Sequence, residues 1–128
     1  MENKKILLVD DEPEILTIFR IFLESAGYEV ESAASAKEAL EKINIKKFHL
    51  AILDINLPDA PGTELLEKIQ DIQPEMIRIV VTGNDIDKTS VNTLRNDADA
   101  YIVKPVKKKI LISIIEQKLN ELQTRKSF

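Results

Sequence analysis

Short apolar runs that each stop at a polar residue constrain the fold of this chain most strongly. Residues 6–9 read ILLV and stop at Asp10, and residues 50–53 read LAIL and stop at Asp54. Runs of this length are too short for helices and are typical of strands covered on both faces of a parallel sheet. Further strand-like segments at 28–33, 77–81 and 100–104 bring the predicted strands to five.

Amphipathic segments separate these strands and predict helices. The first helix is expected to begin at residues 11–14, where acidic residues and an early proline are typical of a helix start, and to stop at Gly27. The second opens with Ser35 and Glu38, which have the spacing of a capping box. A proline- and glycine-rich loop at 57–62 precedes the third.

The three later helices differ in how clearly their sequences predict them. Residues 86–96 contain several Thr, Ser and Asn residues, which are poor helix formers, so the fourth helix is expected to be mobile. In the fifth helix, over about 107–124, we expect Ile112 to be exposed because it lies off the main apolar stripe. The apolar anchors of the third helix are Leu65, Leu66 and Ile69, and those of the fifth are Ile110, Leu111, Ile114, Ile115, Leu119 and Leu122.

Five strands alternating with five helices predict an α/β fold with a doubly wound parallel sheet and right-handed crossovers. The chain has 128 residues, which is the length of one domain, so we expect a single domain over 1–128 with its core at about 4–122. Ligands of such sheets bind beyond the carboxyl ends of the strands. The polar residues at those ends are therefore the candidate site residues.

The candidate site residues are Asp10, Asp11, Asp54, Thr82 and Lys104. Three converging carboxylates repel one another unless a positive group lies among them. Oxygen ligands of this kind suit Mg²⁺, with Mn²⁺ as an alternative. Lys104 adds an ammonium group and Thr82 a hydroxyl donor, so the set could hold a phosphoryl group. An aspartate can also be the nucleophile and form an acyl phosphate.

The composition excludes several other kinds of protein. The chain has no cysteine and one histidine, which excludes disulfides, thiolate metal sites and multi-histidine metal sites. Its net charge of −4 disfavours nucleic-acid binding by the whole surface, so no direct nucleic-acid binding is expected. Neither a membrane-spanning run nor a signal peptide is visible, and a cytoplasmic location is expected.

Four motifs together resemble the receiver domains of two-component response regulators. They are ILLVDDE at 6–12, LDINLP at 53–58 followed by Gly62, VTG at 81–83 and AYIVKP at 100–105. The resemblance covers about residues 4–122 and implies the flavodoxin-like fold of the chemotaxis receiver, with strand order 2-1-3-4-5. In that order Asp10 and Asp54 would follow neighbouring strands, with Thr82 and Lys104 on the next two.

The resemblance also implies a role for each matching residue. Asp54 would be the phosphoacceptor, and Asp10, Asp11, Asp54 and the backbone carbonyl of Asn56 would hold Mg²⁺. Lys104 would bind phosphoryl oxygens, while Thr82 and Tyr101 would be the switch residues. The Lys104–Pro105 bond would be cis. These expectations come from the family and not from the spacing of the residues.

The function expected from the resemblance is a phosphorylation-activated switch and not a turnover enzyme. A histidine kinase or histidine phosphotransfer protein would donate the phosphoryl group. The surface of the fourth helix, fifth strand and fifth helix would then control a downstream protein or a fused output domain. We expect a monomer or a weak phosphorylation-dependent dimer.

Two other functions remain as alternatives. One is a receiver fold that binds a partner without phosphorylation. The other is a small Mg²⁺-dependent phosphatase of the haloacid-dehalogenase type, but that class needs a second acid two residues after a nucleophile on the first strand, and Asp10 is followed by Asp11-Glu12 instead.

Two features outside the motifs have plain structural interpretations. His49 precedes Asp54 by five residues, roughly 16 Å along a strand, and is expected to be a surface residue without a role in phosphotransfer. Lysines 107–109 begin the fifth helix, where their charges oppose the helix dipole. They are interpreted as a solvated patch, with docking of an acidic partner as the alternative.

Overall fold

The computed structural model describes residues 3–83 and 98–126 of the chain. The strands are β1 (Lys5–Val9), β2 (Glu29–Ala33), β3 (Leu50–Asp54), β4 (Ile77–Thr82) and β5 (Ala100–Val103). Four helices lie in the described residues: α1 (Pro13–Ser25), α2 (Ala36–Ile45), α3 (Gly62–Ile72) and α5 (Lys108–Lys126). The predicted helix at 86–96, and its predicted mobility, lie outside the described residues.

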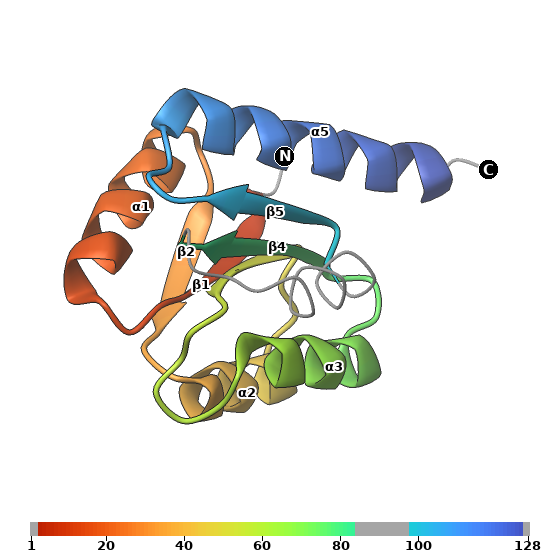
Figure 1. Cartoon of the computed structure of the whole chain (residues 1–128). Helices are drawn as coiled ribbons and strands as arrows, with labels where there is room; N and C mark the ends of the chain where they lie inside the picture. Colours follow the sequence, from red (N-terminus) through yellow and green to blue (C-terminus); the bar gives the residue numbers. More distant parts are fainter. Residues whose placement is uncertain (1–2, 84–97, 127–128) are drawn as a thin grey trace.

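The five strands form one parallel sheet in the order β2-β1-β3-β4-β5. Helices α1 and α5 lie on one side of this sheet and α2 and α3 on the other (Figure 1). The predicted α/β fold and strand order are therefore confirmed. Because all strands run the same way, their carboxyl ends share one edge of the sheet.

The core consists of two apolar clusters separated by the sheet. Along β1, Leu7 and Val9 belong to the cluster on the side of α2 and α3, while Ile6 and Leu8 belong to the cluster on the side of α1 and α5. Successive side chains of a strand point to opposite faces, so a continuously apolar strand fills both clusters. This arrangement explains why the sequences of the buried strands do not alternate between apolar and polar residues.

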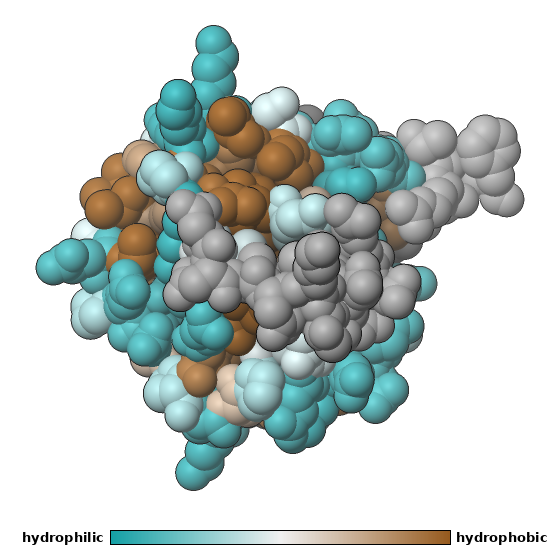
Figure 2. All heavy atoms as spheres, in the orientation of Figure 1, coloured by the Kyte–Doolittle hydropathy of each residue, from teal (hydrophilic) through white to brown (hydrophobic). Residues whose placement is uncertain are grey.

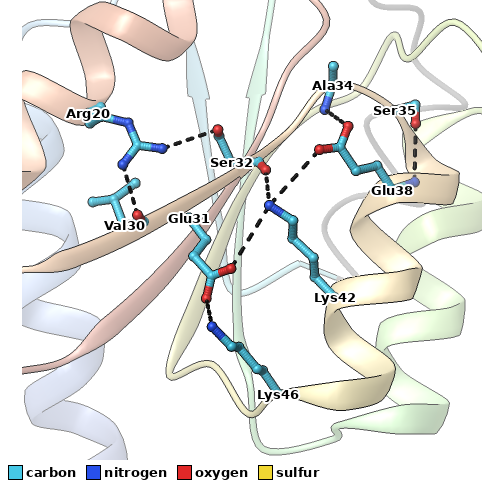
Figure 3. A network of polar contacts seen from close by, with 9 residues as sticks. All are labelled: Arg20, Val30, Glu31, Ser32, Ala34, Ser35, Glu38, Lys42 and Lys46. Carbon is cyan, nitrogen blue, oxygen red and sulfur yellow. Dashed lines mark hydrogen bonds and ion pairs between the residues drawn. The ribbon is translucent and has the colours of Figure 1, made fainter.

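Two helix boundaries follow the local sequence closely. Helix α1 ends at Ser25 and is followed by Gly27, whose positive φ of 94° is the conformation that glycine adopts with least strain. At the start of α2, the Ser35 hydroxyl accepts a hydrogen bond from the Glu38 amide at 3.1 Å (Figure 3). The Glu38 carboxylate in turn accepts one from the Ala34 amide at 3.0 Å. The predicted stop and the Ser35 cap are confirmed, while the return bond of the box comes from Ala34, one residue before the cap.

The apolar face of α5 differs from the expected one. Ile112 is half-buried against the cluster on that side of the sheet, whereas Ile110 is 50% exposed. The prediction for these two residues was wrong because the helix rotation is set by the fully buried Leu111 and Ile115, which place Ile112 nearer the sheet. The helix begins one residue after the predicted start, and residues 107–109 are exposed.

The outer edge of the sheet is covered by basic side chains from both helix layers. Arg20 of α1 donates to the carbonyl of Val30 at 2.9 Å, and Lys42 of α2 donates to the carbonyl of Ser32 at 2.6 Å (Figure 3). Glu31 contacts Lys42 at 3.9 Å and Lys46 at 2.7 Å. Strand β2 is thus an edge strand in which the carbonyls of Val30 and Ser32 accept hydrogen bonds from side chains of the helices.

Candidate functional site

The predicted site residues lie at the carboxyl edge of the sheet. Asp54 ends β3, Thr82 ends β4, and Asp10 and Lys104 directly follow β1 and β5. Val9 is paired with Leu53, and Thr82 is paired with Val103, so the strands end nearly level with one another. This register brings side chains from four strands to one place.

Three carboxylates form a cluster at this edge. One oxygen each of Asp10, Asp11 and Asp54 lie within 4.8 Å of one another. Asp10 is only 3% exposed and Asp54 only 6%, while Asp11 is exposed to solvent. The cluster therefore combines two buried carboxylates with one that faces solvent.

Lys104 lies against the two buried carboxylates. Its Nζ is 3.6 Å from Asp10 Oδ2 and 3.5 Å from Asp54 Oδ2. The other oxygen of each aspartate accepts a backbone hydrogen bond two residues further along the chain: Asp10 from Glu12 at 2.9 Å, and Asp54 from Asn56 at 3.0 Å. These amides orient both carboxylates so that their Oδ2 atoms face the ammonium group.

The charges of the site are unbalanced. Burial raises the pKa of Asp10, the Glu12 amide opposes that rise, and Asp54 adds to it by repulsion. Burial lowers the pKa of Lys104, but attraction to Asp10 and Asp54 outweighs burial and holds that pKa above its usual value. Among the described residues, the three clustered carboxylates outnumber the one ammonium group that contacts two of them, and a hard divalent cation would offset the excess negative charge.

The remaining predicted residues lie on β4 and β5 or directly after β3 and β5. Thr82 is 1% exposed, and its hydroxyl donates to the Gly83 carbonyl at 3.2 Å. Tyr101 lies on β5 and is 39% exposed. The Lys104–Pro105 bond is cis, as the resemblance implies. Asn56 follows β3 and pairs with Pro61 in an isolated bridge, which closes the loop beyond Asp54.

Comparison with known proteins identifies the family. A family model described as the response regulator receiver domain matches residues 6–116. The chain belongs to this family. Receiver domains are the signalling modules of two-component systems, and this chain carries the acidic cluster and the lysine at the carboxyl edge of its sheet.

Individual relatives of this receiver domain are regulatory proteins. It is 40% identical to the regulatory protein VanR of Enterococcus faecium over 117 residues, which cover 91% of this chain and 50% of that protein. It is 37% identical to the alkaline phosphatase synthesis transcriptional regulatory protein PhoP of Bacillus subtilis over 103 residues, 80% of this chain and 43% of that protein. The chain thus spans about half the length of these relatives.

A solved structure resembles this receiver domain along nearly its whole length. The crystal structure of a CheY-like receiver domain protein from Methanospirillum hungatei JF-1 has a TM-score of 0.91 and 48% sequence identity. The match covers 97% of this chain and 99% of that one.

Among the described residues, no helix of the receiver domain combines the length and apolar character needed to cross a membrane.

His49 lies at the opposite end of β3 from the acidic cluster of the receiver domain. It is half-buried and not a plain surface residue, because its Nδ1 accepts a hydrogen bond from the Lys5 amide at 2.9 Å. Its backbone also bonds to Lys5 and Ile77 in the neighbouring strands. Its contacts therefore join the starts of β1, β3 and β4.

Sequence reasoning missed Asp59, which lies in the loop after β3. Its two carboxylate oxygens accept hydrogen bonds from the Ala36 and Lys37 amides, each at 2.9 Å. These bonds lower the pKa of Asp59. The loop composition at 57–62 indicates only a turn, and no local pattern connects Asp59 with a helix that begins more than 20 residues earlier.

Proposed function

We propose that this receiver domain, a single domain over residues 1–128, is a switch activated by phosphorylation of Asp54. The observation that carries the proposal is the meeting of Asp10, Asp11, Asp54 and Lys104 at one edge of the sheet. A histidine kinase or a histidine phosphotransfer protein would be the donor.

The orientation of Asp54 suits it to accept a phosphoryl group. Its Oδ1 is held by the Asn56 amide, and its Oδ2 is 3.5 Å from the Lys104 ammonium. A carboxylate oxygen would attack the phosphorus of a phosphohistidine, so that an O–P bond forms, the N–P bond breaks and the imidazole leaves. Lys104 would neutralise the transferring phosphoryl oxygens.

The donor set fits Mg²⁺, or Mn²⁺, because all of its ligands are oxygens and, in the described part of the chain, its carboxylates outnumber the ammonium group beside them. Asp10, Asp11, Asp54 and the backbone carbonyl of Asn56 would hold the ion. When bound, it would offset the negative charge of the phosphoryl group. Asp10 and Asp11 would then hold the ion while Asp54 carries the phosphoryl group.

The output surface would be the face of β5 and the start of α5, together with the helix predicted at 86–96. Apolar side chains gather over β5 and the first turn of α5 (Figure 2), where Tyr101, Val103 and Ile110 are 39%, 45% and 50% exposed. Thr82 lies on β4 beside this strand, with Val103 as its partner in register. Movement of Thr82 toward a phosphoryl group would thereby be coupled to Tyr101, and this face would contact a downstream protein or a fused output domain.

Intact-protein mass spectrometry tests the proposal. The native protein and Asp54→Asn are incubated with Mg²⁺ and a small acyl phosphate, in parallel with samples that contain a chelator. We expect the native protein alone to gain one phosphoryl group, and only with Mg²⁺. Equal gain by both proteins would mean that Asp54 is not the phosphoacceptor. No gain, with Mg²⁺ binding confirmed, would favour a binding module that works without phosphorylation.

A further inference from the structure

The start of α2 is capped partly by a residue from a distant loop. The first amides of a helix lack partners within the helix. In α2, the Ala36 and Lys37 amides donate to the two oxygens of Asp59, and the Glu38 amide donates to Ser35. Ser35 therefore provides the local part of the cap, and Asp59 ties the loop after β3 to the helix.

That loop is also closed at its base. The Gly62 amide donates to the Ile55 carbonyl at 2.7 Å, and Asn56 pairs with Pro61. The two backbones approach so closely that a Cβ on Gly62 would lie 2.6 Å from Ile55 Cα. With its base closed by Gly62 and its tip held by Asp59, the loop has little freedom at Asn56.

We propose that Asp59 is a positioning residue for the cation site. It would hold the 55–61 loop against α2 and so fix the backbone carbonyl of Asn56 where the ion needs it. The inference rests on the proposed function, in which that carbonyl is a ligand. Mg²⁺ requires nearly ideal octahedral geometry, so a ligand held in place before binding increases affinity.

Ser35 offers a matched control because its hydroxyl caps the same helix through the Glu38 amide, whereas Asp59 caps it from the loop. Asp59→Ala and Ser35→Ala both remove hydrogen bonds from the start of α2. A purely structural role of Asp59 would make the two variants alike. A positioning role separates them, because only Asp59→Ala frees the loop that carries Asn56.

The test measures Mg²⁺ affinity by calorimetry and hydrogen exchange of the Asn56 and Gly62 amides without metal. For Asp59→Ala we expect about a tenfold higher Kd, the lower end of the effect of residues that support metal ligands. Both amides should also exchange faster. Ser35→Ala should keep the native Kd and the native exchange of these amides. Asp59→Asn, which retains one acceptor oxygen, should fall between native protein and Asp59→Ala.

Each outcome bears on a separate proposal. If native protein binds Mg²⁺ and Asp59→Ala has the same Kd as Ser35→Ala, the positioning role is wrong while the proposed function stands. If native protein neither binds Mg²⁺ nor gains a phosphoryl group, the proposed function fails and the positioning role fails with it. Should Asp59→Ala not fold, the comparison is made with Asp59→Asn, and a native Kd in that variant would overturn the inference.

Discussion

At the scale of single residues, the site brings negatively charged carboxylates close together, and two of them are buried. Asp10 and Asp54 are both buried, and the ammonium group of Lys104 lies within 3.6 Å of each. The pKa of Asp10 is raised by burial and by repulsion from Asp54. A folded-state pKa above the unfolded value stabilises the protein below the unfolded pKa, and this stabilisation is lost as pH rises through the folded pKa. Ionised Asp10 therefore lowers stability at neutral pH.

Asp10→Asn should consequently raise the Tm of the metal-free protein at neutral pH. The substitution removes the buried charge, and the amide oxygen of asparagine can still accept the Glu12 hydrogen bond. The gain should disappear below about pH 4, because Asp10 is then protonated in both states. Thermal denaturation in a chelator at both pH values measures this difference, and an unchanged or lower Tm at neutral pH would contradict it.

Gly62 shows how a single missing side chain can decide the path of a loop. Gly62→Ala would place a Cβ against the backbone of Ile55, so the loop must shift. We expect a loss of about 1–3 kcal/mol in the free energy of unfolding, the usual cost of overpacking. Mg²⁺ binding should weaken as well. Urea denaturation and calorimetry measure the two effects.

Gly27→Ala is the control for this prediction. A side chain at Gly27 has open space but is strained by the positive φ of 94°. That variant should lose stability by a backbone effect alone. Its Mg²⁺ affinity should equal that of native protein, and an equal loss of affinity in both variants would refute the local role of Gly62.

At the scale of elements, β2 illustrates how a sheet edge is protected. Glu29 and Ala33 bond toward β1, so the carbonyls of Val30 and Ser32 point away from the sheet. Arg20 from α1 and Lys42 from α2 occupy those two carbonyls. Charged side chains over an edge strand are a known means of preventing another strand from adding to the sheet.

Removing both cations should therefore promote self-association. We expect Arg20→Met combined with Lys42→Met to dimerise or aggregate at concentrations where the native protein does not. The control pair, Lys37→Met with Lys47→Met, removes two positive charges from exposed side chains while leaving the Val30 and Ser32 carbonyls covered. Sedimentation velocity at increasing concentration distinguishes them, and identical behaviour of the two pairs would mean that net charge alone controls association.

At the scale of the whole molecule, cation binding should be linked to global stability. A ligand that binds only the folded state stabilises it by about 2.7 kcal/mol at about a hundredfold excess over its Kd. Mg²⁺ should thus raise the Tm of native protein, and a chelator should reverse the rise. The Tm of Asp10→Asn should not change with Mg²⁺, because this variant lacks one of the buried carboxylate ligands. A similar response in Asp10→Asn would place the ion elsewhere.

Phosphorylation should also change the exposure of a tyrosine on β5. Tyr101 is exposed, whereas Tyr28 is half-buried and serves as an internal control. If phosphorylation turns Tyr101 inward, chemical nitration of Tyr101 should slow while nitration of Tyr28 stays constant. Peptide mass spectrometry after nitration measures both, and unchanged labelling of Tyr101 would argue against a switch through this residue.

Much of the fold can be predicted because it depends on residues that are close to one another in the chain. The apolar runs at 6–9 and 50–53 predict strands, and each polar residue that follows a run must lie at the carboxyl edge of a parallel sheet. For that reason Asp10, Asp54, Thr82 and Lys104 could be proposed as site residues without coordinates. Gly27 and the Ser35 cap are equally local.

Other features depend on contacts between residues far apart in the chain. The rotation of α5, which leaves Ile112 half-buried and Ile110 exposed, is decided by packing against the sheet. Asp59 acquires its role from amides of α2, and Gly62 from its close approach to Ile55. The sequence by itself determined which segments become strands and helices and which residues end them, since backbone preference and side-chain periodicity act locally. Only the tertiary structure decided which helix faces are buried, how the sheet edge is covered and which loop contacts form. These features depend on how elements that are separate in the chain pack against one another.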